Sequence, residues 1–163
     1  MTGTAENLGE FPKDVKQFEH VTTLDLINGY KFSVEFDKGR FIQPLSGSLT
    51  VDEPAPFGES SGPNPVQLLS GAVGSCASVA FLYCLRKKRI VVKNLKTKVT
   101  TLVVRNEKGY FRINGFKVEL FPEVNEEDKA KLKRCCNLLE ELCTITASMR
   151  MGIATEFDVV LQK

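Results

Sequence analysis

The chain of 163 residues is long enough to bury one full hydrophobic core, and we expect a single domain spanning residues 1–163. Hydrophobic residues make up 42% of the chain and charged residues 26%, which are the proportions of an ordinary soluble globular protein. The net charge of +2 argues against a nucleic-acid partner and against an anionic membrane partner. We expect a cytoplasmic location, because residues 1–12 lack the pattern of a signal peptide and the longest apolar run is far shorter than the roughly 20 residues that span a bilayer.

The first third of the chain predicts an arm, a set of short strands and an irregular connector. The strands are rich in β-branched and aromatic residues, and the turns between them carry Asn, Asp and Gly. In chain order, the expected elements are an arm at 1–18, a strand at His20–Ile27, a hairpin turn at Asn28–Gly29, a strand at Lys31–Phe36, a turn at Asp37–Arg40, a short strand at Gly47–Val51 and a Pro- and Gly-rich connector at 53–63.

A long helix is expected to follow the connector. Asn64 can cap its first turn, and Pro65 loses no hydrogen bond at the first helical position. The basic cluster Arg86–Arg89 complements the carboxyl end of the helix, and we interpret it as a solvated helix end. The expected apolar face consists of Leu69, Ala72, Val73, Cys76, Ala80 and Tyr83. Cys76 thus lies among small residues, which allow another segment to approach its thiol closely.

The second half of the chain predicts a hairpin, a helix, a break and a final strand. Asn125 and the acidic residues after it favour a helix start, and Cys143 falls where that helix gives way to the Thr144–Thr146 segment. In chain order, the expected elements are strands at Val91–Arg105 and Tyr110–Phe121 around a turn at Asn106–Gly109, a helix from Asn125 with Leu132, Cys135 or Cys136, Leu139 and Leu142 on its apolar face, a short turn or helix as far as Gly152, and a strand at Thr155–Leu161.

The five cysteines are expected to serve core packing or thiol redox chemistry. A disulfide framework is not expected in a chain without an export signal, and we expect no metal and no other cofactor, because there is no Cys-x-x-Cys pair and the single His20 is remote from every cysteine. Cys84, Cys135 and Cys136 are interpreted as small apolar fillers, whose replacement by alanine costs roughly 1–2 kcal/mol each. Residue patterns alone favour core packing for Cys76 as well, whereas Cys143 stands at a helix break where a side chain can be presented.

Two motifs together resemble those of the OsmC/Ohr superfamily, which comprises osmotically inducible protein C, the organic hydroperoxide resistance proteins and their relatives. The first motif is Asn64-Pro65-x-Gln67-Leu68-Leu69 leading to Gly74-Ser75-Cys76, and the second runs from Cys143 through Thr-Ile-Thr-Ala-Ser-Met-Arg to Gly152-Ile153. The resemblance extends from about Lys31 to Val160 and includes the order of the strands.

This resemblance implies an α+β fold in which antiparallel sheets wrap around a long central helix and two chains form an intertwined homodimer. It also implies a thiol-dependent peroxidase that reduces organic hydroperoxides and is regenerated by a dithiol reductant. Cys76 occupies the position of the family's peroxidatic cysteine and Cys143 that of the resolving cysteine. A Cys76 sulfenic acid and then a Cys76–Cys143 disulfide are the implied intermediates.

Two departures from the family pattern leave a second interpretation open. The hydroperoxide resistance enzymes carry Glu directly after Asn-Pro, where this chain has Val66, and an Arg near the early strands, for which Arg40 or Lys38 are the candidates. Cys76 lies too far into its helix for the helix amino terminus to activate it, so its thiol needs a nearby cation or hydrogen-bond donor. The alternative is an OsmC-like binding protein for a small apolar or thiol-containing ligand, with little or no peroxidase activity.

Overall fold

A computed structural model of the chain describes residues 22–36 and 49–160. They belong to two compact units, Met1–Pro65 and Val66–Lys163, and we consider each unit by itself. The predicted arm at 1–18, the turn at Asp37–Arg40 and residue His20 lie outside the described residues, and the single-domain organisation stays a prediction.

The first unit is built on a three-stranded antiparallel sheet with the order β1-β2-β3, as the strand-rich pattern predicts. Its strands are β1 (Thr22–Asn28), β2 (Lys31–Phe36) and β3 (Leu49–Val51). Asn28 pairs with Lys31, so the hairpin turn consists of Gly29 and Tyr30, one residue later than predicted. Gly29 has a φ of 47°, which glycine adopts at little cost.

The connector after β3 is irregular, as predicted, and it is organised around one buried carboxylate. Oδ2 of Asp52 accepts hydrogen bonds from the backbone N–H groups of Glu59 (3.1 Å) and Ser61 (3.0 Å) and from the Ser61 hydroxyl (2.8 Å). These bonds, that from the Ser61 backbone above all, lower the pKa of Asp52. The carboxylate therefore holds the Pro- and Gly-rich segment in one conformation.

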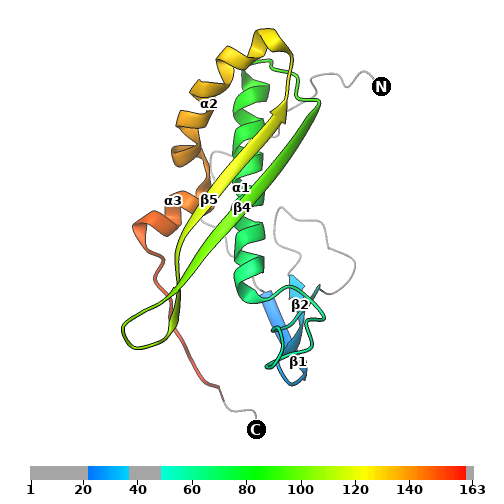
Figure 1. The fold of residues 1–163 in the computed structure, drawn as a ribbon, viewed down its shortest axis with the longest axis vertical. Helices are drawn as coiled ribbons and strands as arrows, with labels where there is room; N and C mark the ends of the chain where they lie inside the picture. The colour runs from blue at the N-terminus through cyan, green and yellow to red at the C-terminus, as the bar shows by residue number, and fades with distance from the viewer. Residues whose placement is uncertain (1–21, 37–48, 161–163) are drawn as a thin grey trace. The chain divides into compact units, whose positions relative to one another are not determined.

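The second unit places a long helix along one face of a two-stranded antiparallel sheet, and a second helix runs beside the first (Figure 1). The Asn106–Gly109 turn joins the two strands as predicted, with the backbone N–H of Gly109 donating to the carbonyl oxygen of Asn106 at 2.9 Å. In chain order, the elements are α1 (Pro65–Lys87), β4 (Asn94–Arg105), β5 (Phe111–Glu123), the short 3-10 helix η1 (Glu126–Asp128), α2 (Lys129–Leu142) and α3 (Thr144–Met151).

Helix α1 packs closely on β4 through a seam of small residues spaced one helical turn apart. The hydroxyls of Ser70 and Thr101 lie 2.6 Å apart, and those of Ser78 and Thr97 lie 2.7 Å apart. Gly74 lies between the two serines on the same face, where a Cβ atom would come within 2.7 Å of the Val99 side chain. The absence of a side chain at Gly74 thus allows the close approach of helix and strand.

Replacement of Gly74 by alanine is expected to lower the free energy of unfolding by about 1–3 kcal/mol, because the new methyl group overpacks the contact with Val99. Gly71→Ala is the matched control, since a Cβ at Gly71 meets no atom of the described residues within 4 Å. That control should gain roughly 0.5–1 kcal/mol from helix propensity. Equal gains for both variants in urea denaturation would contradict the close contact.

The buried face of α1 differs from the predicted one. Of the six residues expected on the apolar face, only Val73 and Ala80 are fully buried, while Ala72 is exposed and Cys76 is half-buried. The fully buried residues are Val73, Gly74, Ala77, Ala80, Phe81, Cys84 and Leu85. The helix is apolar on several sides, so hydropathy alone does not identify the side that the small residues bring against the sheet.

Helix α1 has the predicted length, but it is more apolar than the sequence analysis allowed. It has 23 residues, and an 18-residue window within it reaches a mean hydropathy of 1.8, which is sufficient in length and composition to cross a membrane. The prediction that every apolar run is far too short was therefore wrong. In this fold α1 is the core helix of the second unit, with its buried face against β4 and α2.

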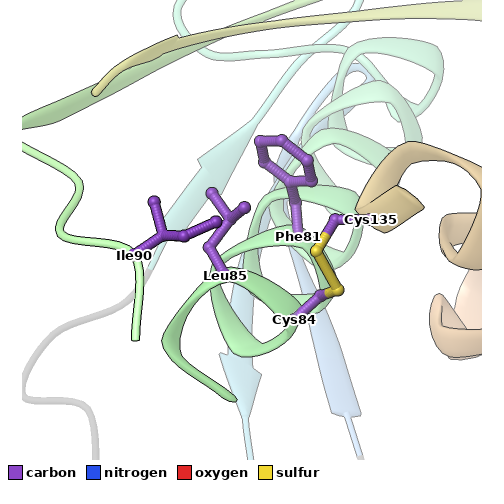
Figure 2. Packing of buried hydrophobic residues seen from close by; sticks show 5 residues of the cluster. All are labelled: Phe81, Cys84, Leu85, Ile90 and Cys135. Carbon is purple, nitrogen blue, oxygen red and sulfur yellow. A yellow bond between two sulfur atoms is a disulfide. The ribbon is translucent and has the colours of Figure 1, made fainter. Parts of the chain in front are cut away.

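Two cysteines predicted as separate core fillers are joined by a disulfide. Cys84 of α1 and Cys135 of α2 form an S–S bond with their Cα atoms 5.7 Å apart, inside a buried cluster with Phe81, Leu85 and Ile90 (Figure 2). The prediction that the cysteines form no structural disulfide is wrong for this pair, because antiparallel packing of the two helices brings together residues 51 positions apart in the chain. Cys136 faces solvent and is not a core filler either.

The predicted final strand at Thr155–Leu161 is not formed between 155 and 160, the part of it that the structure describes. Phe157, Val159 and Val160 are between 84% and 91% exposed. A strand needs a neighbouring edge with which to pair its backbone, and no described strand pairs with this segment.

Candidate functional site

Cys143 occupies the junction of two helices, as the predicted break requires. It ends α2, with its backbone N–H donating to the Leu139 carbonyl at 3.0 Å, and it also precedes α3, with its carbonyl accepting from the Ala147 N–H at 3.0 Å. Its own backbone is extended, with φ −81° and ψ 100°. The helix junction thus fixes the backbone that carries the Cys143 side chain, and Cys143 is only 1% exposed.

The structure brings Cys143 into contact with Cys76 of α1. The two cysteines pack together in a small cluster with Ala77 and Ala80, and each thiol shifts the pKa of the other. Neither cysteine is bonded to a third one, since both are free thiols. Two residues far apart in the sequence thus form one dithiol site.

The two thiols differ in acidity. Burial raises the pKa of Cys76, and the hydrogen bonds that it accepts from backbone N–H groups at the start of α3 do not compensate. Burial also raises the pKa of Cys143, but hydrogen bonds from the Thr146 side chain and N–H, from Cys76 and from the Ile145 N–H outweigh burial and leave the pKa lowered. Of the two thiols, Cys143 is therefore the more acidic and Cys76 the less acidic.

Beside Cys143 lies a cavity of about 210 Å³ with mostly apolar walls. Arg150 of α3 lies at this cavity and forms an ion pair with Glu140 of α2, with Nη2 and Oε1 3.2 Å apart. Cys76 is not among the lining residues, which are Ala77, Phe116, Val118, Leu120, Leu139, Glu140, Cys143, Thr146 and Arg150.

Sequence reasoning missed Thr146 and Arg150 as members of the site. Both belong to the second motif, three and seven residues after Cys143, a spacing that places them on one face of a helix with Cys143. That spacing is the signal that could have identified them. Arg40, the candidate cation from the sequence, lies outside the described residues. Between 22–36 and 49–160, no group of three or more His, Cys, Asp or Glu side chains could hold a metal ion.

Thr146→Val is expected to raise the pKa of Cys143, because it removes a hydroxyl donor that stabilises the thiolate and keeps the side-chain shape. The pH at which alkylation of Cys143 reaches half its maximal rate should move upward. Thr144→Val is the control, since that exposed side chain is not among the donors to Cys143. An unchanged alkylation midpoint in Thr146→Val would show that its hydroxyl has no such role.

The α+β fold with antiparallel sheets and the pair of free thiols between two helices place this chain among small thiol proteins. Comparison with known proteins identifies its family. A family model described as OsmC-like protein matches residues 58–158, which is more than half of the chain. The chain therefore belongs to the OsmC-like family, within the OsmC/Ohr superfamily. None of the curated proteins matches the chain.

Solved structures share this fold at low sequence identity. An OsmC-like protein of unknown function from Vibrio cholerae has a TM-score of 0.67 at 17% identity, with 80% of this chain and 93% of that chain covered. The organic hydroperoxide resistance protein OhrB of Bacillus subtilis has a TM-score of 0.57 at 19% identity, covering 83% and 93%. An organic hydroperoxide resistance protein from Legionella pneumophila, also called OsmC and predicted redox protein, has a TM-score of 0.59 at 16% identity, covering 82% and 90%.

Proposed function

We propose that the protein is a thiol-dependent peroxidase that reduces organic hydroperoxides. The observation that carries the proposal is the contact between Cys76 and Cys143 at the start of α3, beside a cavity with mostly apolar walls. An apolar wall favours an alkyl or lipid hydroperoxide over hydrogen peroxide. The names of two structures with the same fold, which are called organic hydroperoxide resistance proteins, support the same substrate class.

In the proposed reaction Cys76 is the nucleophile and the Cys143 thiolate is its base. The proton of Cys76 moves to Cys143, and the Cys76 sulfur attacks the terminal oxygen of the hydroperoxide. The O–O bond breaks, and the alkoxide leaves as an alcohol with the proton held by Cys143, so that Cys76 becomes a sulfenic acid. The Cys143 thiolate then attacks the Cys76 sulfur and expels hydroxide, which takes a proton from solvent to give water and a disulfide.

A dithiol reductant closes the proposed cycle. One of its thiolates attacks the Cys76–Cys143 disulfide to form a mixed disulfide, and its second thiol displaces the protein thiolate. The two electrons that reduced the hydroperoxide are thereby returned to the pair. The raised pKa of Cys76 does not prevent this chemistry, because the neighbouring thiolate accepts the proton during attack.

The test is to react the reduced protein with one equivalent of cumene hydroperoxide and to map its disulfides by mass spectrometry. The expected product is one equivalent of cumyl alcohol together with a chain that has lost two hydrogens, with Cys76 joined to Cys143. Hydroperoxide that remains unconsumed, with both thiols still free, would reject the peroxidase proposal.

A binding protein for a small apolar or thiol-containing ligand is the second candidate. It is favoured by Val66, which replaces the family's Glu at the start of α1, and by the burial that raises the pKa of the Cys76 thiol. Binding of an apolar fluorescent probe by the Cys76→Ser variant, combined with no peroxide consumption by the wild type, would select this candidate.

We further propose that the protein is a homodimer, and we expect light scattering to give twice the chain mass at micromolar concentration. The supporting features are the exposed apolar segment at 153–160, with alternating side chains that suit a strand, and Val79 of α1, which is 63% exposed. A second copy would supply the edge that the segment lacks and cover these side chains. A folded monomer under those conditions would contradict the proposal.

A further inference from the structure

Two cysteine pairs bridge the same two helices at matched positions. Cys84 and Cys135 are bonded, and Cys76 and Cys143 are in contact. From Cys76 to Cys84 and from Cys135 to Cys143 the chain advances by eight residues in each case, which is about 12 Å along a helix. The two pairs therefore connect the antiparallel helices at two successive levels. Leu139 packs against both buried clusters, the one that contains Cys84 and Cys135 and the one that contains Cys143.

The disulfide lies at the centre of the narrow contact by which α2 rests on α1. Cys135 is the single fully buried residue of α2 among those the structure describes, while Leu132, Leu138 and Leu139 are half-buried around it. The charged residues of α2 on either side face solvent. The non-covalent part of this contact is thus limited to a few leucines, and the S–S bond adds a covalent link among them.

We propose that Cys84 and Cys135 form a positioning pair, whose disulfide fixes α2 on α1 and thereby holds Cys143 against Cys76 through successive reaction cycles. A slip of α2 by one helical turn would move Cys143 by about 5.4 Å, which is enough to separate the two thiols. The role goes beyond the proposed peroxidase activity, because it concerns the formation of the dithiol site whatever its substrate.

The positioning disulfide is formed before α2 packs, since Cys135 is 0% and Cys84 is 5% exposed in the folded unit. The oxidant is a small-molecule disulfide. The thiolate of one cysteine attacks it to form a mixed disulfide and releases one thiol, and the second cysteine thiolate then displaces the other thiol. Two protein thiols lose two hydrogens and the small disulfide is reduced to two thiols. Burial afterwards excludes thiol reductants from the bond.

The first experiment counts disulfides. Oxidised wild-type protein is treated with a mild thiol reductant while folded, and is then denatured and alkylated for intact-mass analysis. Three alkylated cysteines are expected, with Cys84 and Cys135 still joined. Five alkylated cysteines would overturn the proposal, because the pair would not resist the reductant that regenerates Cys76 and Cys143.

The second experiment measures positioning with a readout that does not depend on peroxide. In Cys84→Ala/Cys135→Ala, disulfide formation between Cys76 and Cys143 by diamide is expected to slow about tenfold or more, and the alkylation midpoint of Cys143 is expected to rise toward that of an ordinary thiol. Among the described residues, the titratable or charged groups near Cys143 are Cys76 of α1, Glu140 of α2 and Arg150 of α3, and all three are retained. Cys136→Ala, one position away and exposed, is the control and should leave both readouts unchanged.

A double variant that folds by circular dichroism, yet keeps the wild-type diamide rate and alkylation midpoint, would overturn the positioning role and leave a purely stabilising bond. Should the double variant not fold, wild-type protein in which a phosphine has reduced both cysteine pairs is compared with protein in which Cys84–Cys135 remains bonded. The same two readouts then decide the question. Failure of the peroxidase proposal alone would leave both readouts intact, so the two failures are distinguishable.

Discussion

Cys76→Ser is expected to abolish hydroperoxide consumption, whereas Cys143→Ser is expected to permit a single turnover and then stop. The first variant lacks the sulfur that attacks the hydroperoxide in the proposed mechanism, although Cys143 remains at the cavity. In the second variant Cys76 can still become a sulfenic acid, but no thiol resolves it, and excess peroxide oxidises it further to a sulfinic acid. Because Cys143 is also the proposed base, that single turnover should be slower than in the wild type.

Stopped-flow reduction of cumene hydroperoxide with intact-mass analysis of each variant measures this asymmetry. Cys136→Ser is the control and should behave as wild type, since Cys136 is exposed and does not line the cavity. The opposite pattern, with a single turnover in Cys76→Ser, would assign the attack to Cys143, the cysteine that lines the cavity. Equally slow consumption by the wild type and Cys76→Ser would leave the binding function as the remaining candidate.

Loss of the Cys84–Cys135 disulfide is expected to lower the free energy of unfolding by about 4 kcal/mol. The two cysteines lie 51 positions apart, and cross-linking a chain over such a span removes that much entropy from the unfolded state. Urea denaturation of oxidised wild type and of Cys84→Ala/Cys135→Ala gives the difference. Cys136→Ala should change the value by less than about 0.5 kcal/mol, as surface substitutions usually do.

This expected loss is larger than the roughly 1–2 kcal/mol that the sequence suggests for a small cavity at either cysteine. A measured loss within that lower range would mean that the bond constrains the unfolded chain less than its span implies. The comparison therefore tests whether the covalent bond contributes stability beyond that of packing one side chain.

The elements of the second unit were largely predictable because their boundaries carry local signals. Asn64-Pro65 marks the start of α1, the basic residues after Leu85 mark its end, and Asn106 and Gly109 form the turn between β4 and β5. The helix break at Cys143 was likewise visible in the sequence. Each of these features depends on a few neighbouring residues, so one sequence suffices to identify them.

The features that escaped prediction depend on contacts between distant segments. Which side of α1 is buried depends on β4, against which Gly74 fits. The Cys84–Cys135 bond depends on how α2 lies on α1, and the acidity of Cys143 depends on hydrogen bonds from Thr146 in the next helix as well as on burial. Neither spacing nor hydropathy in a single sequence specifies such pairings.

The equal spacing of the two cysteine pairs restricts how this protein can vary in length. One residue added within 77–83 would turn Cys76 by about 100° around α1 relative to Cys84, so that only one of the two could still meet its partner. A compensating insertion within 136–142 would be required on the other helix. The exposed turn at 106–109 is under no such restriction. Single residues in these two helix segments can therefore be replaced independently of one another. An insertion or deletion in one segment, by contrast, requires a matching change in the other.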